Sequence, residues 1–278
     1  MTFKDWCISQ KDKVKQQFRQ LMGYELNLDN PQTLCEKLNW LKIYDSNFLK
    51  TYCADKLLVR EYVKEKIGKD LFLPVLGVYD KFEEIDFSKL PKNYAIKCNH
   101  GSGMNIIVKD SKVNKQEVKQ KLDRWMKTDY LHLYEFFYKS IQKKIFIEQY
   151  QENIGKNSLT DYKFLCYNGE IKYLQVINGR FTNNLHFNYY TPDFKPMTEI
   201  SWNFHPARYD LPDSKPNTFE EMKEISNVLC KDFKCVRVDF YEIENKPYLS
   251  ELTFIPAGGY IKYKNKNTDL ELGKLLKL

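Results

Sequence analysis

Strand-like runs joined by two-residue turns fill much of the second half of the chain, and this pattern restricts the fold more than any other. Asn168-Gly169 separates the runs 161–167 and 170–177, and Asn-Gly is a strong signal for a tight hairpin. Glu244-Asn245 separates two further runs in the same way. Strands joined so closely must be antiparallel. Because helices and a smaller group of strands precede them, the sequence predicts an α+β fold and argues against a doubly wound parallel sheet.

The first half of the chain is mostly helical. Helical periodicity covers residues 10–22, 32–44, 47–54, 56–67 and 115–127, and a later helix is expected over 218–232. Asp55 is placed to cap the fourth of these helices, and Gly68 to end it. The aromatic run 130–141 is interpreted as a continuation of the helix before it. We expect three parts: a helical region 1–68, a small subdomain 69–145 and a large subdomain 146–278.

Composition argues against several classes of protein. The net charge of +7, from 44 basic and 37 acidic residues, is spread along the chain without long runs of like charge, so nucleic-acid binding is disfavoured. No apolar run approaches the ~20 residues of a membrane span. The first residues lack the apolar centre of a signal peptide. Seven cysteines without a C-x-x-C pattern favour a reducing, cytoplasmic location over a zinc ribbon or a disulfide scaffold.

A glycine loop is the first candidate site, because the common P-loop and serine-hydrolase motifs are missing. Lys97 ends a predicted strand (94–99), Gly101-Ser102-Gly103 follows, and a second short strand (105–110) comes after it. Glycines let backbone amides approach an anion closely, and a lysine adds a charge suited to phosphate. Taken alone, the same residues also fit a simple hairpin turn with a lysine beside it.

Two carboxylates on neighbouring predicted strands form the second candidate site. Arg237 and Asp239 share one face of their strand, and Glu251 and Thr253 share one face of the next. A hairpin that places these faces side by side brings Asp239 and Glu251 together, and two close carboxylates favour a cation between them. Oxygen ligands of this kind suit Mg²⁺ held jointly with phosphates. A surface ladder in which Arg237 pairs with a carboxylate explains the pattern equally well.

These elements together resemble the ATP-grasp superfamily, and most closely its branch of TupA-like proteins associated with teichuronopeptide and capsule biosynthesis. Four blocks carry the resemblance: 30–68, 90–110, 161–176 and 235–259. It implies two α+β subdomains that hold ATP between mostly antiparallel sheets, with a short helical N-terminal region. It also implies an enzyme that joins a carboxylate to an amine through an acyl phosphate and releases ADP.

The resemblance assigns residues to ATP and Mg²⁺, the cofactors it implies. Lys56 and Lys97 correspond to the lysines that hold the phosphates. The loop over the γ-phosphate corresponds to His100, Gly101, Ser102, Gly103 and Met104. The hinge that meets adenine corresponds to Glu148, Gln149 and Tyr150, and Glu152 is a weaker candidate for the ribose. The Mg²⁺ ligands correspond to Asp239 and Glu251, and the cation that steadies the acyl phosphate corresponds to Arg237.

The chain departs from the superfamily in two places. Thr253 stands where an asparagine ligand of Mg²⁺ is usual. Helices also replace the usual N-terminal Rossmann-like domain, which often helps to bind the acceptor, so the acceptor site is the hardest part to assign. Asp161, Lys163 and Arg180 are expected to line the cleft, and Arg180 is the best candidate for an acidic substrate, although an exposed loop arginine is equally plausible. The aromatic stretch 130–138 fits core packing better than a sugar pocket, and residues 183–213 fit a lid.

The expected function is an ATP- and Mg²⁺-dependent carboxylate–amine ligase. The family association points to a small-molecule carboxylate, such as a nucleotide-linked uronic acid of surface-polysaccharide assembly, and an amine. A kinase or glycosyltransferase on the same fold is the alternative, although the chain has no D-x-D motif. A non-catalytic or nucleic-acid-binding protein is a third possibility.

Overall fold

The computed structural model describes residues 1–150, 159–180 and 182–278. In these ranges the α-helices are α1 (Phe3–Ser9), α2 (Lys11–Met22), α3 (Leu34–Tyr44), α4 (Phe48–Ala54), α5 (Leu58–Ile67), α6 (Lys115–Lys127), α7 (Phe219–Leu229) and α8 (Asn267–Lys274). The strands are β1 (Val75–Tyr79), β2 (Tyr94–Cys98), β3 (Asn105–Val108), β4 (Ile145–Gln149), β5 (Asp161–Tyr167), β6 (Glu170–Asn178), β7 (His186–Tyr190), β8 (Cys235–Ile243) and β9 (Lys246–Thr253). No helix of the described ranges has both the length and the apolar character needed to cross a membrane.

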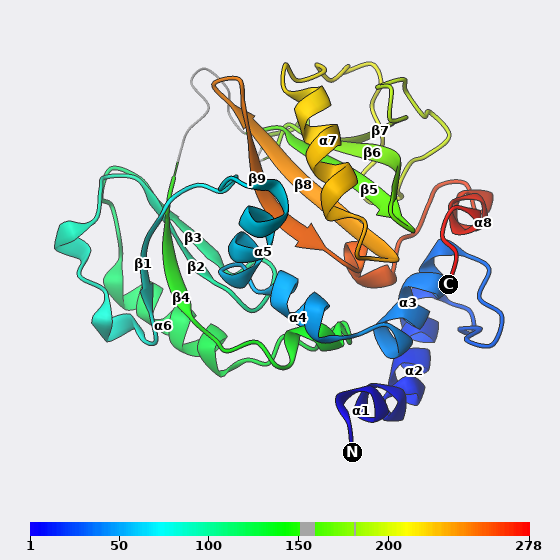
Figure 1. The fold of residues 1–278 in the computed structure, drawn as a ribbon, viewed down its shortest axis with the longest axis horizontal. Coiled ribbons are helices and arrows are strands. Elements are labelled where there is room, and N and C mark those ends of the chain that lie inside the picture. Colours follow the sequence, from blue (N-terminus) through cyan, green and yellow to red (C-terminus); the bar gives the residue numbers. More distant parts are fainter. Residues whose placement is uncertain (151–158, 181) are drawn as a thin grey trace.

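Two antiparallel sheets form the framework, which confirms the predicted α+β class (Figure 1). The small sheet has the order β1-β4-β2-β3, and the large sheet has the order β7-β6-β5-β8-β9. Every neighbouring pair is antiparallel. β4 pairs with β1 and β2 and therefore belongs to the small sheet.

Both predicted hairpin turns are confirmed. Tyr167 pairs with Glu170 across Asn168-Gly169, whose φ angles are 52° and 78°. Ile243 pairs with Lys246 across Glu244-Asn245, whose φ angles are 50° and 58°. Positive φ at both central residues gives a twist that matches the flanking strands. The second turn places β8 and β9 in one tight hairpin, and this hairpin carries the predicted carboxylates.

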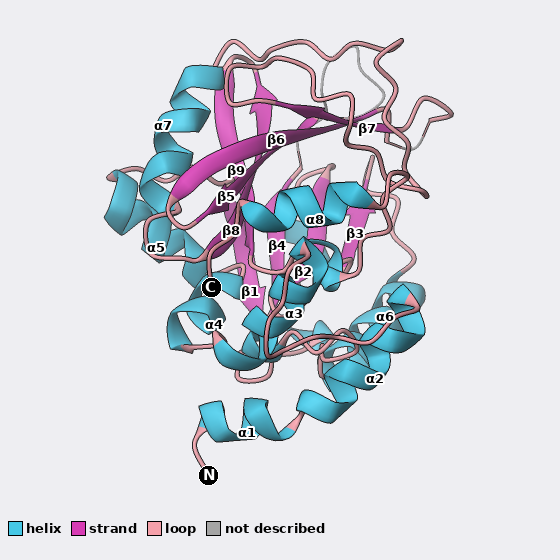
Figure 2. Ribbon diagram, turned by 90° about the vertical axis from the view of Figure 1, so that its right-hand side faces the viewer, coloured by secondary structure: helices cyan, strands magenta, loops and turns pink. Residues whose placement is uncertain are grey.

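Helices cover the outer faces of the two sheets. Val118 and Leu122 of α6 pack against Ile96 and Ile145 of the small sheet and form a separate core. α7 packs on β5, β6 and β8 of the large sheet, and α5 contacts α7. Figure 2 shows α1 to α4 gathered at one end of the molecule. The helical N-terminal region therefore adds to the core of the large sheet instead of forming a separate lobe.

The expected helix over residues 130–141 is wrong. Only Phe136–Tyr138 form a short 3₁₀ turn, and Tyr134 has a left-handed φ of 55° that no α-helix accommodates. The neighbouring rings of Phe136 and Phe137 pack on different partners, Trp6 and Phe254. Core packing of these two aromatics thus takes precedence over helical propensity, in agreement with the expectation that the stretch packs in the core.

Candidate functional site

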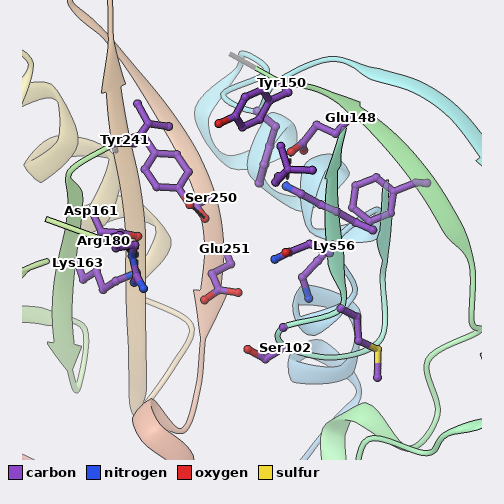
Figure 3. A pocket seen from close by; sticks show the side chains of 18 of the residues that line it. Lys56, Ser102, Glu148, Tyr150, Asp161, Lys163, Arg180, Tyr241, Ser250 and Glu251 are labelled. Carbon is purple, nitrogen blue, oxygen red and sulfur yellow. Dashed lines mark hydrogen bonds and ion pairs between the residues drawn. The ribbon is translucent and has the colours of Figure 1, made fainter. Parts of the chain in front are cut away.

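A cavity of about 680 Å³ lies between the two sheets. Lys97, Phe146 and Glu148 line it from the small sheet, and Asp161, Lys163, Tyr241, Ser250 and Glu251 line it from the large sheet. Figure 3 shows the two walls facing each other, with Tyr150 and Tyr241 toward one end and Ser102 toward the other. The cavity therefore has an aromatic end and an end formed by the glycine loop and Glu251.

The cavity is lined by several aromatic and aliphatic side chains, and Tyr150 and Tyr241 lie at its aromatic end (Figure 3). The set is Phe72, Ile107, Phe146, Tyr150, Leu159 and Tyr241. Of the predicted hinge residues, Glu148 and Tyr150 line this cavity. Gln149 lines a different one, together with Leu76, residues 89–93 and Tyr150. Glu152, the weaker ribose candidate, lies outside the described residues. An apolar slot with a few polar groups at its edge is the usual setting for a planar ligand.

Lys56 joins the glycine loop to the start of α5. Its backbone N–H donates to Asn99 O at 3.2 Å, and its ammonium donates to the carbonyl of Gly101. Burial lowers the pKa of Lys56, with Glu251 acting in the opposite direction. Asp55 Oδ1 accepts from the Leu57 amide at 2.8 Å, so it caps the turn before α5, although the helix itself begins at Leu58. These contacts hold an ammonium group at the cavity wall.

The glycine loop presents only part of itself to the cavity. Ser102, Gly103 and Met104 line it, and Gly103 has a φ of 74°, which favours glycine. Gly101 does not line the cavity, and its missing Cβ makes room for the Tyr130 ring, which would lie 2.6 Å from such an atom. His100 is also absent from the lining, because it is buried with its Nε2 at 3.1 Å from Trp125 O. Thus the structure brings three of the five predicted loop residues to the cavity.

Glu148 is held by two cations. It forms ion pairs with Lys97 on β2 and with Arg60 on α5, the latter at 2.7 Å. Arg60 also donates to Leu73 O at 2.8 Å. Sequence reasoning missed Arg60, because its position in the predicted helix 56–67 gives no sign that it pairs with Glu148, 88 residues later. Glu148 therefore positions Lys97 in addition to lining the aromatic end.

Alternating charges run along four neighbouring segments of the large-sheet wall. Asp161, Lys163, Arg180 and Glu251 line the cavity, whereas Arg237, Asp239 and Thr253 are not part of its lining. Arg180 Nε lies 2.6 Å from Asp161 Oδ2, and Lys163 Nζ lies 3.1 Å from Asp161 Oδ1 and 2.6 Å from Asp239 Oδ2. Arg237 donates to both oxygens of Asp239, at 2.7 and 2.6 Å. The side chains of Asp161, Lys163, Arg180 and Glu251 lie along this wall in Figure 3. This chain of contacts, called the charge ladder below, ends at Glu251 and Thr253.

The strand register explains the charge ladder. Lys163 lies opposite Asp239, and Asp239 lies opposite Glu251, so one row crosses β5, β8 and β9. Arg237 lies opposite Thr253 in the next row on the same face. The predicted side-by-side arrangement of the two carboxylates is confirmed. Burial would raise the pKa of Asp239, but Arg237 and Lys163 outweigh it and lower that pKa.

Of the two carboxylates, Glu251 is the one available to a divalent cation that is shared with a ligand. In the described part of the chain, no cluster of three or more His, Cys, Asp or Glu side chains is arranged for a metal. Glu251 lines the cavity with 33% of its side chain exposed, whereas both oxygens of the buried Asp239 are already bound to Arg237 and Lys163. The hydroxyl of Thr253 accepts from Arg237 at 3.1 Å and donates to Glu251 at 3.2 Å. Mg²⁺ takes few protein ligands and completes its shell with water and phosphate, so this donor set suits it.

Comparisons with solved structures found the following similarities. The chain resembles D-alanine–D-alanine ligase from Bacillus anthracis (18% identity, TM-score 0.43), over 76% of this chain and 56% of that one. It also resembles a D-cycloserine synthetase (11% identity, TM-score 0.45), over 87% of this chain and 76% of that one. A third similar structure is phosphoribosylamine–glycine ligase from Thermotoga maritima (11% identity, TM-score 0.42), over 78% of this chain and 53% of that one. A search of curated proteins found no match.

The family comparison covers far more of the sequence than any single motif does. The chain spans 56% and 59% of the length of two D-alanine–D-alanine ligases that it resembles, from Bacillus anthracis and Helicobacter pylori. The model of the family described as "TupA-like ATPgrasp" matches residues 36–277 of this chain. These residues include both sheets, the glycine loop and the charge ladder. This chain therefore belongs to the TupA-like ATP-grasp family and has the ATP-grasp fold.

Proposed function

We propose that this protein is an ATP- and Mg²⁺-dependent ligase that joins a carboxylate to an amine. The observation that carries the proposal is the cavity between the two sheets, which has lysines on one wall and the charge ladder on the other. A polyphosphate between these walls would meet Lys56 and Lys97 from one side and the end of the ladder from the other. The aromatic end of the same cavity suits adenine.

Mg²⁺ fits at Glu251, with Asp239 as a second ligand once Lys163 or Arg237 releases one of its oxygens. When bound, the ion would offset charge on the phosphates. Lys56 and Lys97 would hold the phosphates from the opposite wall, and the amides of Ser102 to Met104 would cover them. Arg237 stays charged throughout, because Asp239 and Glu251 raise its pKa despite its burial.

The chemistry proceeds in two steps that require no nucleophilic side chain. A carboxylate oxygen of the substrate attacks the γ-phosphorus of ATP, ADP leaves, and an acyl phosphate forms. The amine then attacks the acyl carbon, the C–N bond forms, and phosphate departs with the electrons of the C–O bond. Arg180 has two terminal nitrogens beyond its bond to Asp161, and we assign it to the substrate carboxylate.

We place the substrate among uronic-acid-type sugars of surface-polysaccharide assembly and the reaction in the cytoplasm, where ATP is available. Support for the sugar comes from the branch of the family and not from a sugar site in the cavity. The test is incubation of the protein with ATP, Mg²⁺, nucleotide-linked uronic acids and a panel of amines, followed by mass analysis. Formation of ADP, together with a product whose mass equals that of the uronic-acid substrate plus the amine minus one water, supports the ligase. A phosphorylated sugar instead supports a kinase on the same fold.

Variants distinguish product formation by this protein from ATP hydrolysis by a contaminating enzyme. Glu251→Gln removes the accessible carboxylate and should abolish product formation. Glu244→Gln is the matched control, because it lies on the turn of the same β8–β9 hairpin, away from the cavity lining. Equal product formation by Glu251→Gln and the unaltered protein would refute the proposed site.

A further inference from the structure

The turn between β6 and β7 carries Arg180, the residue that we assign to the substrate carboxylate. Arg180 lines the cavity on the large-sheet wall, beside Asp161 (Figure 3). Its Nε–H donates to Asp161 Oδ2 at 2.6 Å, and its side chain is 40% exposed. A hydrogen bond near the end of a long side chain leaves the path of the backbone open. The contacts that anchor the turn therefore decide where the guanidinium lies.

The two ends of this turn are held by one carboxylate oxygen. Asn178 and His186 are paired across β6 and β7. Asn178 Nδ2 donates to Asp213 Oδ1 at 3.3 Å, and His186 Nε2 lies 3.1 Å from the same oxygen. His186 Nδ1 lies 2.6 Å from Asn184 O, inside the turn. Because both ring nitrogens of His186 meet oxygen acceptors, this arrangement calls for a proton on each, and the imidazolium faces the Asp213 carboxylate.

Asp213 is a buried anchor from a distant segment. Its side chain is 0% exposed, and its second oxygen accepts from Asn188 Nδ2 and from the Tyr190 hydroxyl, each at 3.0 Å. It follows His186 by 27 residues and Asn178 by 35, so the anchor forms only when the segment after β7 has folded back. Donors buried around a carboxylate are costly to leave unpaired, which makes Asp213 a firm point of attachment for the turn.

The turn transmits this attachment to Arg180. Gly179 has a φ of 69°, and a Cβ there would lie 2.4 Å from Asn184 O, so the backbone is closely packed just before Arg180. Asn178 Oδ1 accepts from the Gly179 N–H at 2.8 Å. The amide of Asn178 thus binds Asp213 on one side and the residue before Arg180 on the other. A continuous path of contacts joins the buried carboxylate to the guanidinium.

We propose that Asp213 and His186 are positioning residues for Arg180, which hold the turn so that the guanidinium faces the substrate carboxylate. Within the described ranges the cavity lining includes neither Asp213 nor His186, so they act through Arg180 and not on the substrate. The inference rests on the proposed function for the ligand of Arg180. The placement of Arg180, in contrast, can be measured without any substrate.

Nitrogen-15 NMR of the arginine Nε–H groups in the full chain measures that placement, and Arg180→Met identifies the signal. In the unaltered protein the Arg180 Nε–H should exchange slowly with water, because Asp161 accepts it. In Asp213→Asn the exchange should be at least about 10-fold faster, as expected when a hydrogen bond to a charged group is lost. Asn178→Ala leaves the buried Asp213–His186 pair intact and removes only its link to the turn, so the exchange should be about 3-fold faster.

Asp232→Asn is the matched control for Asp213→Asn. Asp232 also binds a tyrosine hydroxyl and a cation, Tyr62 at 2.9 Å and Lys66 at 2.7 Å, but it lies outside the cavity lining of the described residues. Asp232→Asn should lower Tm without changing the exchange of the Arg180 Nε–H. The control thus separates a general loss of stability from a displaced Arg180.

Kinetics with the uronic acid and amine of the panel that form product give the second readout. Asp213→Asn should raise the KM for the carboxylate at least about 10-fold and leave the Kd of ATP, measured by calorimetry, within about 2-fold. In the double variant, Asp213→Asn should add nothing to the KM of Arg180→Met alone, because Asp213 acts through Arg180.

Unchanged Nε–H exchange in Asp213→Asn and Asn178→Ala overturns the proposal, even if Tm falls, because Asp213 then serves folding alone. Independent effects of Asp213→Asn and Arg180→Met on KM overturn it as well. Faster exchange in Asp213→Asn, with no product from the unaltered protein and any carboxylate of the panel, refutes the proposed function and supports the placement of Arg180 by Asp213.

Discussion

Asp239→Asn should destabilise the protein as well as inactivate it. Asp239 is fully buried, and its carboxylate binds Arg237 at 2.7 and 2.6 Å and Lys163 at 2.6 Å. Breaking a buried ion pair by removing one partner costs about 3–5 kcal/mol. Lys163 keeps Asp161 at 3.1 Å, and Arg237 keeps Thr253 at 3.1 Å, so we expect the lower end of this range. A loss of about 3 kcal/mol corresponds to a fall of about 6–9 °C in Tm.

Urea and thermal unfolding of Asp239→Asn and Glu251→Gln measure this difference. Glu251 is partly exposed and its contact with Arg237 is long, 3.5 Å, so Glu251→Gln should change the free energy of unfolding by less than about 1 kcal/mol. The pKa of Asp239 is lowered in the folded state, so its contribution is present above the unfolded pKa of about 3.9 and is lost as pH falls through the folded value. Equal Tm values for Asp239→Asn and the unaltered protein would refute the charge-ladder argument.

Three further substitutions test other parts of the account. Arg60→Met removes one of the two cations on Glu148 and should weaken ATP binding about 10-fold by calorimetry, whereas Arg19→Met, at an exposed pair with Glu25, should not. Burial lowers the pKa of Lys42 from 10.5 to about 7 in the folded protein, so between these pH values the unfolded chain binds more protons than the folded one. The free energy of unfolding of the unaltered protein, relative to that of Lys42→Met, should therefore rise from pH 7 to about 10. A difference that does not change with pH would contradict the lowered pKa of Lys42. Gly258→Ala adds a Cβ 2.6 Å from Leu133 Cδ1 at a φ of 60°, and it should lower the free energy of unfolding in urea by about 1–3 kcal/mol. Gly103 has a similar φ of 74° but open space around its Cβ position, so Gly103→Ala should lower it by less.

The sheets and the charged rows could be predicted from the sequence because local chemistry specifies them. Asn168-Gly169 determines one hairpin, and the alternation of Arg237 and Asp239 on β8 determines that they share one face with Glu251 and Thr253 of β9. The same reasoning placed β2 and β3 on either side of the glycine loop.

The rest depends on contacts between segments distant in sequence. The residues around His100 in the sequence do not indicate that its imidazole will lie against Trp125 O and not in the cavity. Glu135 follows a residue with left-handed φ in a stretch of helical composition, so its buried position follows only from the packing of Phe136 and Phe137. For such residues the tertiary environment, and not local preference, decides the position.

The central claim is that a carboxylate is activated as an acyl phosphate in the cavity between the sheets. The most direct measurement uses a uronic-acid donor whose carboxylate carries oxygen-18, with ATP, Mg²⁺ and an amine, and determines the label in the products by mass spectrometry. An acyl-phosphate mechanism yields ADP, an amide and inorganic phosphate that carries one oxygen-18 atom from the carboxylate. AMP with pyrophosphate, or phosphate without label, would contradict it.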